Sequence, residues 1–100
     1  MIARMWHGVV PKQKEEAYLR LMRTTAIPDY RSVQGNKLAL VLRKREGDAT
    51  HFITFTLWDS LESIRAFAGA DVERAKYYDF DPGFLIELEP TVQHYEAYEN

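Results

Sequence analysis

The chain has 100 residues, of which 46% are hydrophobic and 28% are charged, and its formal net charge is -2. This composition is typical of a single globular domain and excludes a largely disordered chain. Lysine and arginine are mixed with acidic residues along the sequence, so no basic patch indicates a nucleic-acid partner.

Other features of the sequence narrow the protein class further. The chain contains no cysteine, which excludes disulfides and a thiolate nucleophile. No apolar run approaches the ~20 residues that span a bilayer, so we expect no membrane partner. The N-terminal sequence MIARMWHGVV lacks the pattern of a secretory signal. We therefore expect a cytoplasmic protein.

The first strand is expected over residues 2–10 (IARMWHGVV). Alternation along a strand gives two faces, with Ile2, Arg4 and Trp6 on one and Ala3, Met5, His7 and Val9 on the other. Pro11 suits the first turn of the helix that the spacing of apolar residues predicts over 12–26. Pro28 is expected to end this helix or bend its exit, because the residue before a proline is disfavoured in the α region.

A β-hairpin is expected next. Gly35 and Asn36 predict a turn, and residues 37–45 (KLALVLRKR) read as the second strand. Gly47 is expected to supply the positive φ of a hairpin turn into a third strand over 50–58. Neither face of the third strand is strongly polar: one carries Phe52, Thr54, Thr56 and Trp58, and the other Ile53, Phe55 and Leu57.

A second helical layer and a last strand complete the chain. Asp59, with Glu62 three residues later, predicts an Asp variant of the capping box, and Gly69 is expected to end that helix. Asp71 is expected to cap a further helical segment, VERAKYY (72–78), which residues 79–83 interrupt. Residues 90–99 then predict the fourth strand.

The order strand, helix, strand, strand, helix, strand indicates an α+β, ferredoxin-like split βαβ domain that covers residues 1–100. Its helices cover one face of a four-stranded antiparallel sheet. The other face carries apolar residues from the second and third strands, and monomers rarely expose more than a few hundred Å² of such surface. We therefore predict a homodimer in which two sheets pack face to face.

Three stretches carry a family resemblance: TLWDSLESIRAFAG (56–69), DVERAKYY (71–78) and VQHYE (92–96). With these, the whole chain resembles the antibiotic biosynthesis monooxygenase superfamily of dimeric α/β barrels. The superfamily includes cofactor-independent oxygenases of aromatic polyketides, haem-degrading enzymes and members without a known reaction. The resemblance thus implies the fold and the dimer, and leaves the substrate open.

The haem-degrading branch is similar in one residue and different in two others. Trp58 matches its tryptophan at the end of the third strand. That branch has an asparagine in the first strand, where this chain reads Trp6–His7, and an axial histidine where this chain offers Tyr77 or Tyr78. These departures argue against haem cleavage.

His7 and His94 are the candidate catalytic bases, because a neutral histidine accepts a proton near pH 7. Their strands are expected to be neighbours, but the sequence leaves open whether they share a face, and a structural role is the alternative for each. Two histidines without suitably spaced carboxylates do not predict a metal site. His51, next to a turn, is expected to be exposed.

Aromatic residues provide the remaining candidates. Tyr77 is a candidate catalytic donor to a developing oxyanion, and Trp6, Trp58 and Tyr78 are candidates for ligand contact, with packing in the core as the alternative. Arg4, if buried, needs a partner or an anionic ligand.

Two functions remain open at this point. No glycine-rich phosphate loop or Walker motif occurs, so we expect no flavin, nicotinamide or nucleotide cofactor. The first function is a monooxygenase-like, cofactor-independent oxidation of a small aromatic or phenolic compound. The alternative is a non-catalytic dimeric module that binds a small hydrophobic ligand or regulates a partner.

Overall fold

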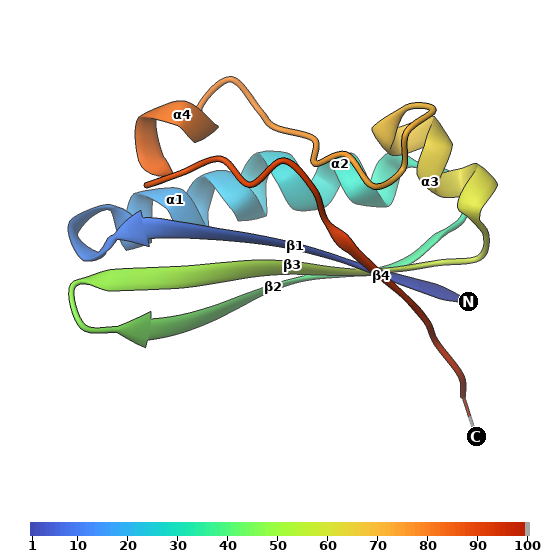
Figure 1. Cartoon of the computed structure of the whole chain (residues 1–100), viewed down its shortest axis with the longest axis horizontal. Coiled ribbons are helices and arrows are strands. Elements are labelled where there is room, and N and C mark those ends of the chain that lie inside the picture. Colours follow the sequence, from blue (N-terminus) through green and yellow to red (C-terminus); the bar gives the residue numbers. More distant parts are fainter. Residues whose placement is uncertain (100) are drawn as a thin grey trace.

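The structure is a computed structural model that describes residues 1–99. It has two layers, an antiparallel sheet and a set of helices that all lie on one side of it (Figure 1). The strands are β1 (Ile2–Pro11), β2 (Asn36–Glu46), β3 (Ala49–Trp58) and β4 (Gln93–Glu96), in the spatial order β2-β3-β1-β4. This confirms the predicted α+β split βαβ arrangement.

Within residues 1–99 the helical layer consists of four α-helices and two other helical turns: a 3-10 turn (Lys12–Lys14), α1 (Glu15–Leu21), a π-helical turn (Met22–Ala26), α2 (Ile27–Ser32), α3 (Leu61–Ala68) and α4 (Asp81–Phe84). None of the helices described within residues 1–99 is long and apolar enough to cross a membrane.

Pro28 does not end the first helix, which continues as α2 to Ser32. A proline inside a helix lacks an N–H and clashes with the carbonyl of the preceding turn. Here the wider π-helical turn comes directly before α2, and Pro28 falls within the first two positions of α2. The π turn explains why the helix accommodates Pro28 instead of ending there.

The N-cap of α3 is Ser60, not Asp59 as predicted. Ser60 still has extended backbone angles (φ -160°, ψ 165°), so the helix begins one residue later than the capping pattern indicated. The Ser60 Oγ accepts a hydrogen bond from the Ser63 N–H at 3.3 Å, and the Asp59 carboxylate accepts one from the Ser63 hydroxyl at 2.6 Å. Gly69 ends the helix with φ +96°, as predicted.

The segment 72–78 is not helical, which corrects the second prediction for this region. Its backbone pairs instead with the approach to β4: the Ala75 N–H donates to the Pro90 carbonyl, and the Val92 N–H to the Glu73 carbonyl, both at 2.9 Å. These bonds satisfy backbone groups that a helix would have paired internally. Because residues 90–92 form this pairing, β4 itself covers only Gln93–Glu96 of the predicted 90–99.

The two sheet faces differ in burial as the alternation predicted. On the helix side, Phe52 and Trp58 of β3 have no exposed surface. The opposite face, here called the open face, has no cover from residues 1–99. It carries Ala3, Met5, His7 and Val9 of β1, Leu38, Leu40 and Leu42 of β2, His51, Ile53, Phe55 and Leu57 of β3, and Gln93 and Tyr95 of β4.

Candidate functional site

The candidate site lies on the helix side of the sheet, where β1 pairs with β4. Arg4 of β1 is directly opposite His94 of β4, and Trp6 is two residues further along the same face of β1. Arg4 and Trp6 retain only 1% and 3% of their surface. Strand alternation thus brings a cation, an imidazole and an indole together under the helical layer.

Arg4 is a buried cation without an acidic partner. Its Nη2 donates to the Arg74 carbonyl at 3.1 Å, and its guanidinium carbon lies 5.5 Å from the centre of the Phe67 ring. Its Nε has no hydrogen-bond partner, and no ion pair among residues 1–99 includes Arg4. Burial lowers the pKa of Arg4, yet a guanidinium stays charged at neutral pH.

His94 presents an unpartnered nitrogen next to this cation. Its Nε2 is buried and has no hydrogen-bond partner. Burial, followed by the positive charge of Arg4, lowers the pKa of His94 below its usual value of 6.5, and the opposing effect of Glu73 is smaller. His94 is therefore neutral at pH 7, in the form that accepts a proton.

Trp6 and Tyr77 form an edge-to-face pair, with ring centres 6.2 Å apart. Gly8 makes room for the Trp6 ring, because a Cβ at this position would lie 2.5 Å from the indole. The Tyr77 hydroxyl donates to the Glu89 carbonyl, and burial raises the pKa of Tyr77. Its proton is thus already bound within the protein, which leaves it poorly placed as a donor to an oxyanion.

Trp58 and Tyr78 are packed and hydrogen-bonded within the chain. The Trp58 indole N–H donates to the Thr56 hydroxyl at 2.8 Å, and its ring lies 5.8 Å from Phe67. The Tyr78 hydroxyl donates to the Asp29 carboxylate at 2.7 Å, and burial raises the pKa of Tyr78. Both residues stabilise the helical layer over the sheet in this conformation.

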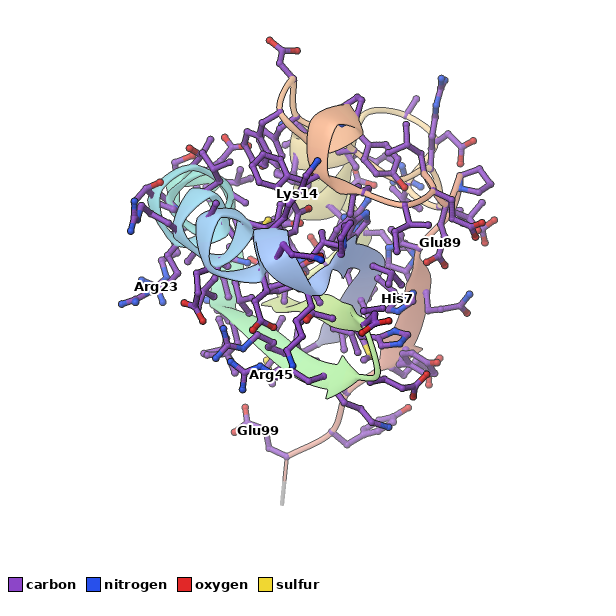
Figure 2. The ribbon with its side chains drawn as sticks, turned by 90° about the vertical axis from the view of Figure 1, so that its left-hand side faces the viewer. His7, Lys14, Arg23, Arg45, Glu89 and Glu99 are labelled. Atoms are coloured by element: carbon purple, nitrogen blue, oxygen red, sulfur yellow. The ribbon has the colours of Figure 1, made fainter. Side chains whose placement is uncertain are left out.

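His7 lies on the other side of the sheet, so the structure does not bring the two candidate bases together. Its Nδ1 is 2.5 Å from the Glu89 carboxylate, and its Nε2 is 2.9 Å from Nδ1 of His51. Figure 2 shows His7 and Glu89 next to each other at one side of the molecule. His51, expected to be exposed, is half-buried because it stacks on His7.

The His7–His51 pair borders a shallow cavity of about 220 Å³ on the open face, together with Leu42, Ile53 and Glu46. The two imidazoles hydrogen-bond to each other instead of pointing at a common centre. Among residues 1–99, no group of three histidine, aspartate or glutamate side chains is placed to hold a metal ion.

The two tyrosines at the position of the axial histidine do not fit a haem iron. The resemblance pointed to Tyr77 or Tyr78 as the axial ligand, but both hydroxyls donate hydrogen bonds, to Glu89 and Asp29. Burial raises the pKa of each, which opposes the phenolate form that would bind iron. Trp58, the residue shared with the haem-degrading branch, is fully buried.

Arg4 is the site residue that sequence reasoning named only conditionally. The signal was its position on one strand face with Trp6, but burial depends on segments distant in the sequence. Arg74, which accepts its hydrogen bond, and Phe67, which stacks on it, come from the other half of the chain.

No protein-family model matches the chain, and no curated protein sequence matches it. Several solved structures match the chain. A protein named as an antibiotic biosynthesis monooxygenase from Nitrosomonas europaea matches with a TM-score of 0.71 at 16% identity, over 99% of this chain and 100% of that one. One of the same name from Deinococcus radiodurans matches with a TM-score of 0.64 at 22% identity, over 100% and 95%.

A variant of MhuD, with two manganese protoporphyrin IX molecules bound per active site, matches with a TM-score of 0.61. Its identity is 14%, over 100% of this chain and 97% of that one. At such identities the likeness concerns the fold. The chain therefore has the fold of the antibiotic biosynthesis monooxygenases, as the resemblance implied.

Proposed function

We propose that the protein is a monooxygenase-like enzyme that oxidises a small aromatic or phenolic compound without a cofactor, between the helices and the sheet. The observation that carries this proposal is the buried, unpartnered Nε2 of the neutral His94 next to the charge of Arg4. A base and a fixed positive charge, both shielded from water, are what the removal of a phenolic proton requires.

The proposed reaction uses these groups in order. His94 Nε2 takes the proton of a phenol or enol, and Arg4 stabilises the anion that remains. The electron-rich anion reacts with O₂: one oxygen atom enters a ring methylene carbon as a carbonyl, and the other leaves with the two methylene hydrogens as water. Trp6 provides a flat face against which the ring stacks.

Oxygen uptake with anthrone as substrate tests this proposal. We expect uptake above the uncatalysed rate, and a decrease of ~100-fold or more for His94→Gln, since general-base catalysis contributes about that factor. His51→Gln is the matched control, because His51 lies on the open face, and its uptake should be unchanged. A folded His94→Gln variant with full activity would refute the assignment of the base.

A non-catalytic role as a small-ligand-binding module is the second candidate. It is favoured by the cavity of about 220 Å³ next to His7 and His51, which presents Leu42 and Ile53 to an apolar compound and is lined by neither Arg4 nor His94. A module of this kind would bind an aromatic compound without consuming oxygen. Binding measured in parallel with oxygen uptake therefore separates the two functions.

We also propose that the protein is a homodimer in which the open faces of two copies pack together. Leu40 and Leu42 are 42% and 41% exposed there, and Tyr95 is 54% exposed. Three strands of 10 or 11 residues make a face of roughly 500 Å². The chain after β4 leaves the body on this same side, away from the helices (Figure 1). A stable interface buries ~800 Å² per partner, so the side chains that project from the face and the segment after β4 have to contribute the remainder.

A further inference from the structure

Arg4 carries a charge that nothing within residues 1–99 neutralises. Its side chain is 99% buried, and its neighbours are the Arg74 carbonyl, the Phe67 ring and the uncharged phenols of Tyr30 and Tyr78. None of these bears a negative charge. A buried charge without a counter-charge destabilises a fold, so its presence requires another explanation than stability.

Two buried or half-buried carboxylates of the helical layer, Asp29 and Asp81, already have other partners. Asp29 accepts hydrogen bonds from Lys76 at 3.1 Å and from Tyr78 at 2.7 Å. Asp81 accepts from the Tyr18 hydroxyl at 2.7 Å and from the Tyr78 N–H at 2.6 Å. No small rearrangement of these groups would provide an acid for Arg4 without breaking bonds elsewhere.

Two further nitrogens on neighbouring strand positions also lack hydrogen-bond partners. Within residues 1–99, the buried side-chain polar atoms without a hydrogen-bond partner are Arg4 Nε, Trp6 Nε1 and His94 Nε2. Each buried polar group of this kind costs free energy. All three belong to neighbouring positions on the helix side of β1 and β4, so they form one cluster.

We propose that this cluster is an anion-binding site that takes the oxyanion of a planar aromatic ligand, with the negative oxygen accepting from Arg4 Nε and Nη2. The Nε and Nη2 atoms lie on the same edge of the guanidinium, which suits two parallel hydrogen bonds to an oxyanion. The Trp6 indole N–H adds a third donor, and His94 becomes a fourth once it has taken the proton of a phenol. The ring lies against Trp6.

A ligand reaches this site through the segment 72–78. The Arg74 carbonyl of this segment accepts the bond from Arg4 Nη2. The segment contains no helix, is joined to residues 90–92 by two backbone hydrogen bonds, and is attached to Asp29 through Lys76 and Tyr78. An oxyanion that replaces the Arg74 carbonyl on Nη2 removes the contact between Arg4 and this segment, so the ligand enters where the backbone at Arg74 moves away from the sheet.

This inference rests on the proposed function, because it uses the same site. It adds that the ligand of this site carries a negative charge. The test uses 2-naphthoate as the probe, since its carboxylate remains ionised at pH 7, and neutral 2-naphthamide as the matched control. Binding to the intact protein is measured by calorimetry. We expect naphthoate to bind ~10-fold more tightly or better, because a hydrogen bond to a charged group contributes about that much.

Arg4→Met distinguishes a binding role from a structural one. We expect this variant to lose the preference for naphthoate and to melt at the same temperature as the wild type or higher, because an uncompensated charge is removed. Arg4→Lys should retain part of the preference. Arg45→Met is the control, since Arg45 is paired with Glu15 at 3.0 Å and lies at the far end of β2.

Equal affinity for the two probes in the wild type overturns the inference, as does an Arg4→Met variant that binds naphthoate as before. If Arg4→Met fails to fold, the affinities of the wild type and of Arg4→Lys for the two probes decide whether the inference holds. Naphthoate binding without oxygen uptake from anthrone would support this site and refute the oxygenase. Uptake without a preference for the anion would refute this inference alone.

Discussion

His94 determines the pH range in which the proposed reaction runs. Its pKa lies below 6.5, because burial and the Arg4 charge disfavour the imidazolium. A base is active above its pKa, so kcat/KM should be constant around pH 7 and decline only below pH 6.5. A pH–rate profile checks this, and a decline that begins above pH 6.5 would contradict the assignment.

Tyr18 and Asp81 make a buried contact between α1 and α4 that tests the packing of the helical layer. Tyr18 has no exposed surface, and its hydroxyl donates to Asp81 at 2.7 Å. Tyr18→Phe leaves a carboxylate oxygen without this donor, so unfolding in urea should show a loss of about 1–3 kcal/mol. Tyr98→Phe, on a residue that is 84% exposed, should change little. An equal loss in both variants would contradict this view of the contact.

The residues of the site show what a sequence alone reveals about chemistry. The alternation of β1 correctly placed Arg4 and Trp6 on one face and His7 on the other. The face of His94 stayed open because it depends on the register of β1 with β4, which pairs Arg4 with His94. Burial of Arg4 depends on residues such as Arg74, 70 positions away, and no local pattern contains this information.

Two turn glycines with positive φ offer a test at the scale of elements. Gly35 (φ +98°) precedes β2, and a Cβ there would lie 2.0 Å from the Ser63 hydroxyl and 2.6 Å from the Asp59 carboxylate. Gly47 (φ +60°) lies in the β2–β3 turn with nothing within 4 Å of such a Cβ. Alanine at position 47 should cost ~1 kcal/mol for its backbone alone.

Gly35→Ala should cost more than Gly47→Ala, because it also displaces the hydroxyl and carboxylate groups at the start of α3. Urea unfolding of the two variants measures the difference. Equal losses would show that the contact between the β2 turn and α3 adapts freely to the extra methyl group.

Elements with strong local signals were predicted well, and those that depend on distant partners were not. The turns at Gly35 and Gly47 and the end of α3 at Gly69 follow from positive φ, which is a local property. The segment 72–78 has helical spacing, but its backbone pairs with 90–92 instead. Pro28 indicated a break because the π-helical turn that accommodates it has no sequence signal.

At the scale of the whole molecule, the open face is where the proposed dimer is tested. Phe55 lies at its centre, paired with Leu40 on one side and Met5 on the other. Phe55→Asp should convert the dimer into a monomer, because it places a charge within the interface. Leu61→Asp is the control, since Leu61 is equally apolar and 39% exposed but lies on α3. Sedimentation at micromolar concentration measures the oligomeric state of both variants and of the wild type. A monomeric wild type would contradict the dimer.

The claim that the ligand lies between the helices and β1 is tested most directly by a crystal structure of the protein with 2-naphthoate. We predict that the carboxylate lies ~2.7–2.9 Å from Arg4 Nε, as expected for a charge-assisted hydrogen bond, with the ring against Trp6. Naphthoate bound in the His7–His51 cavity of the open face instead, with the bond between Arg4 and the Arg74 carbonyl intact, would contradict it.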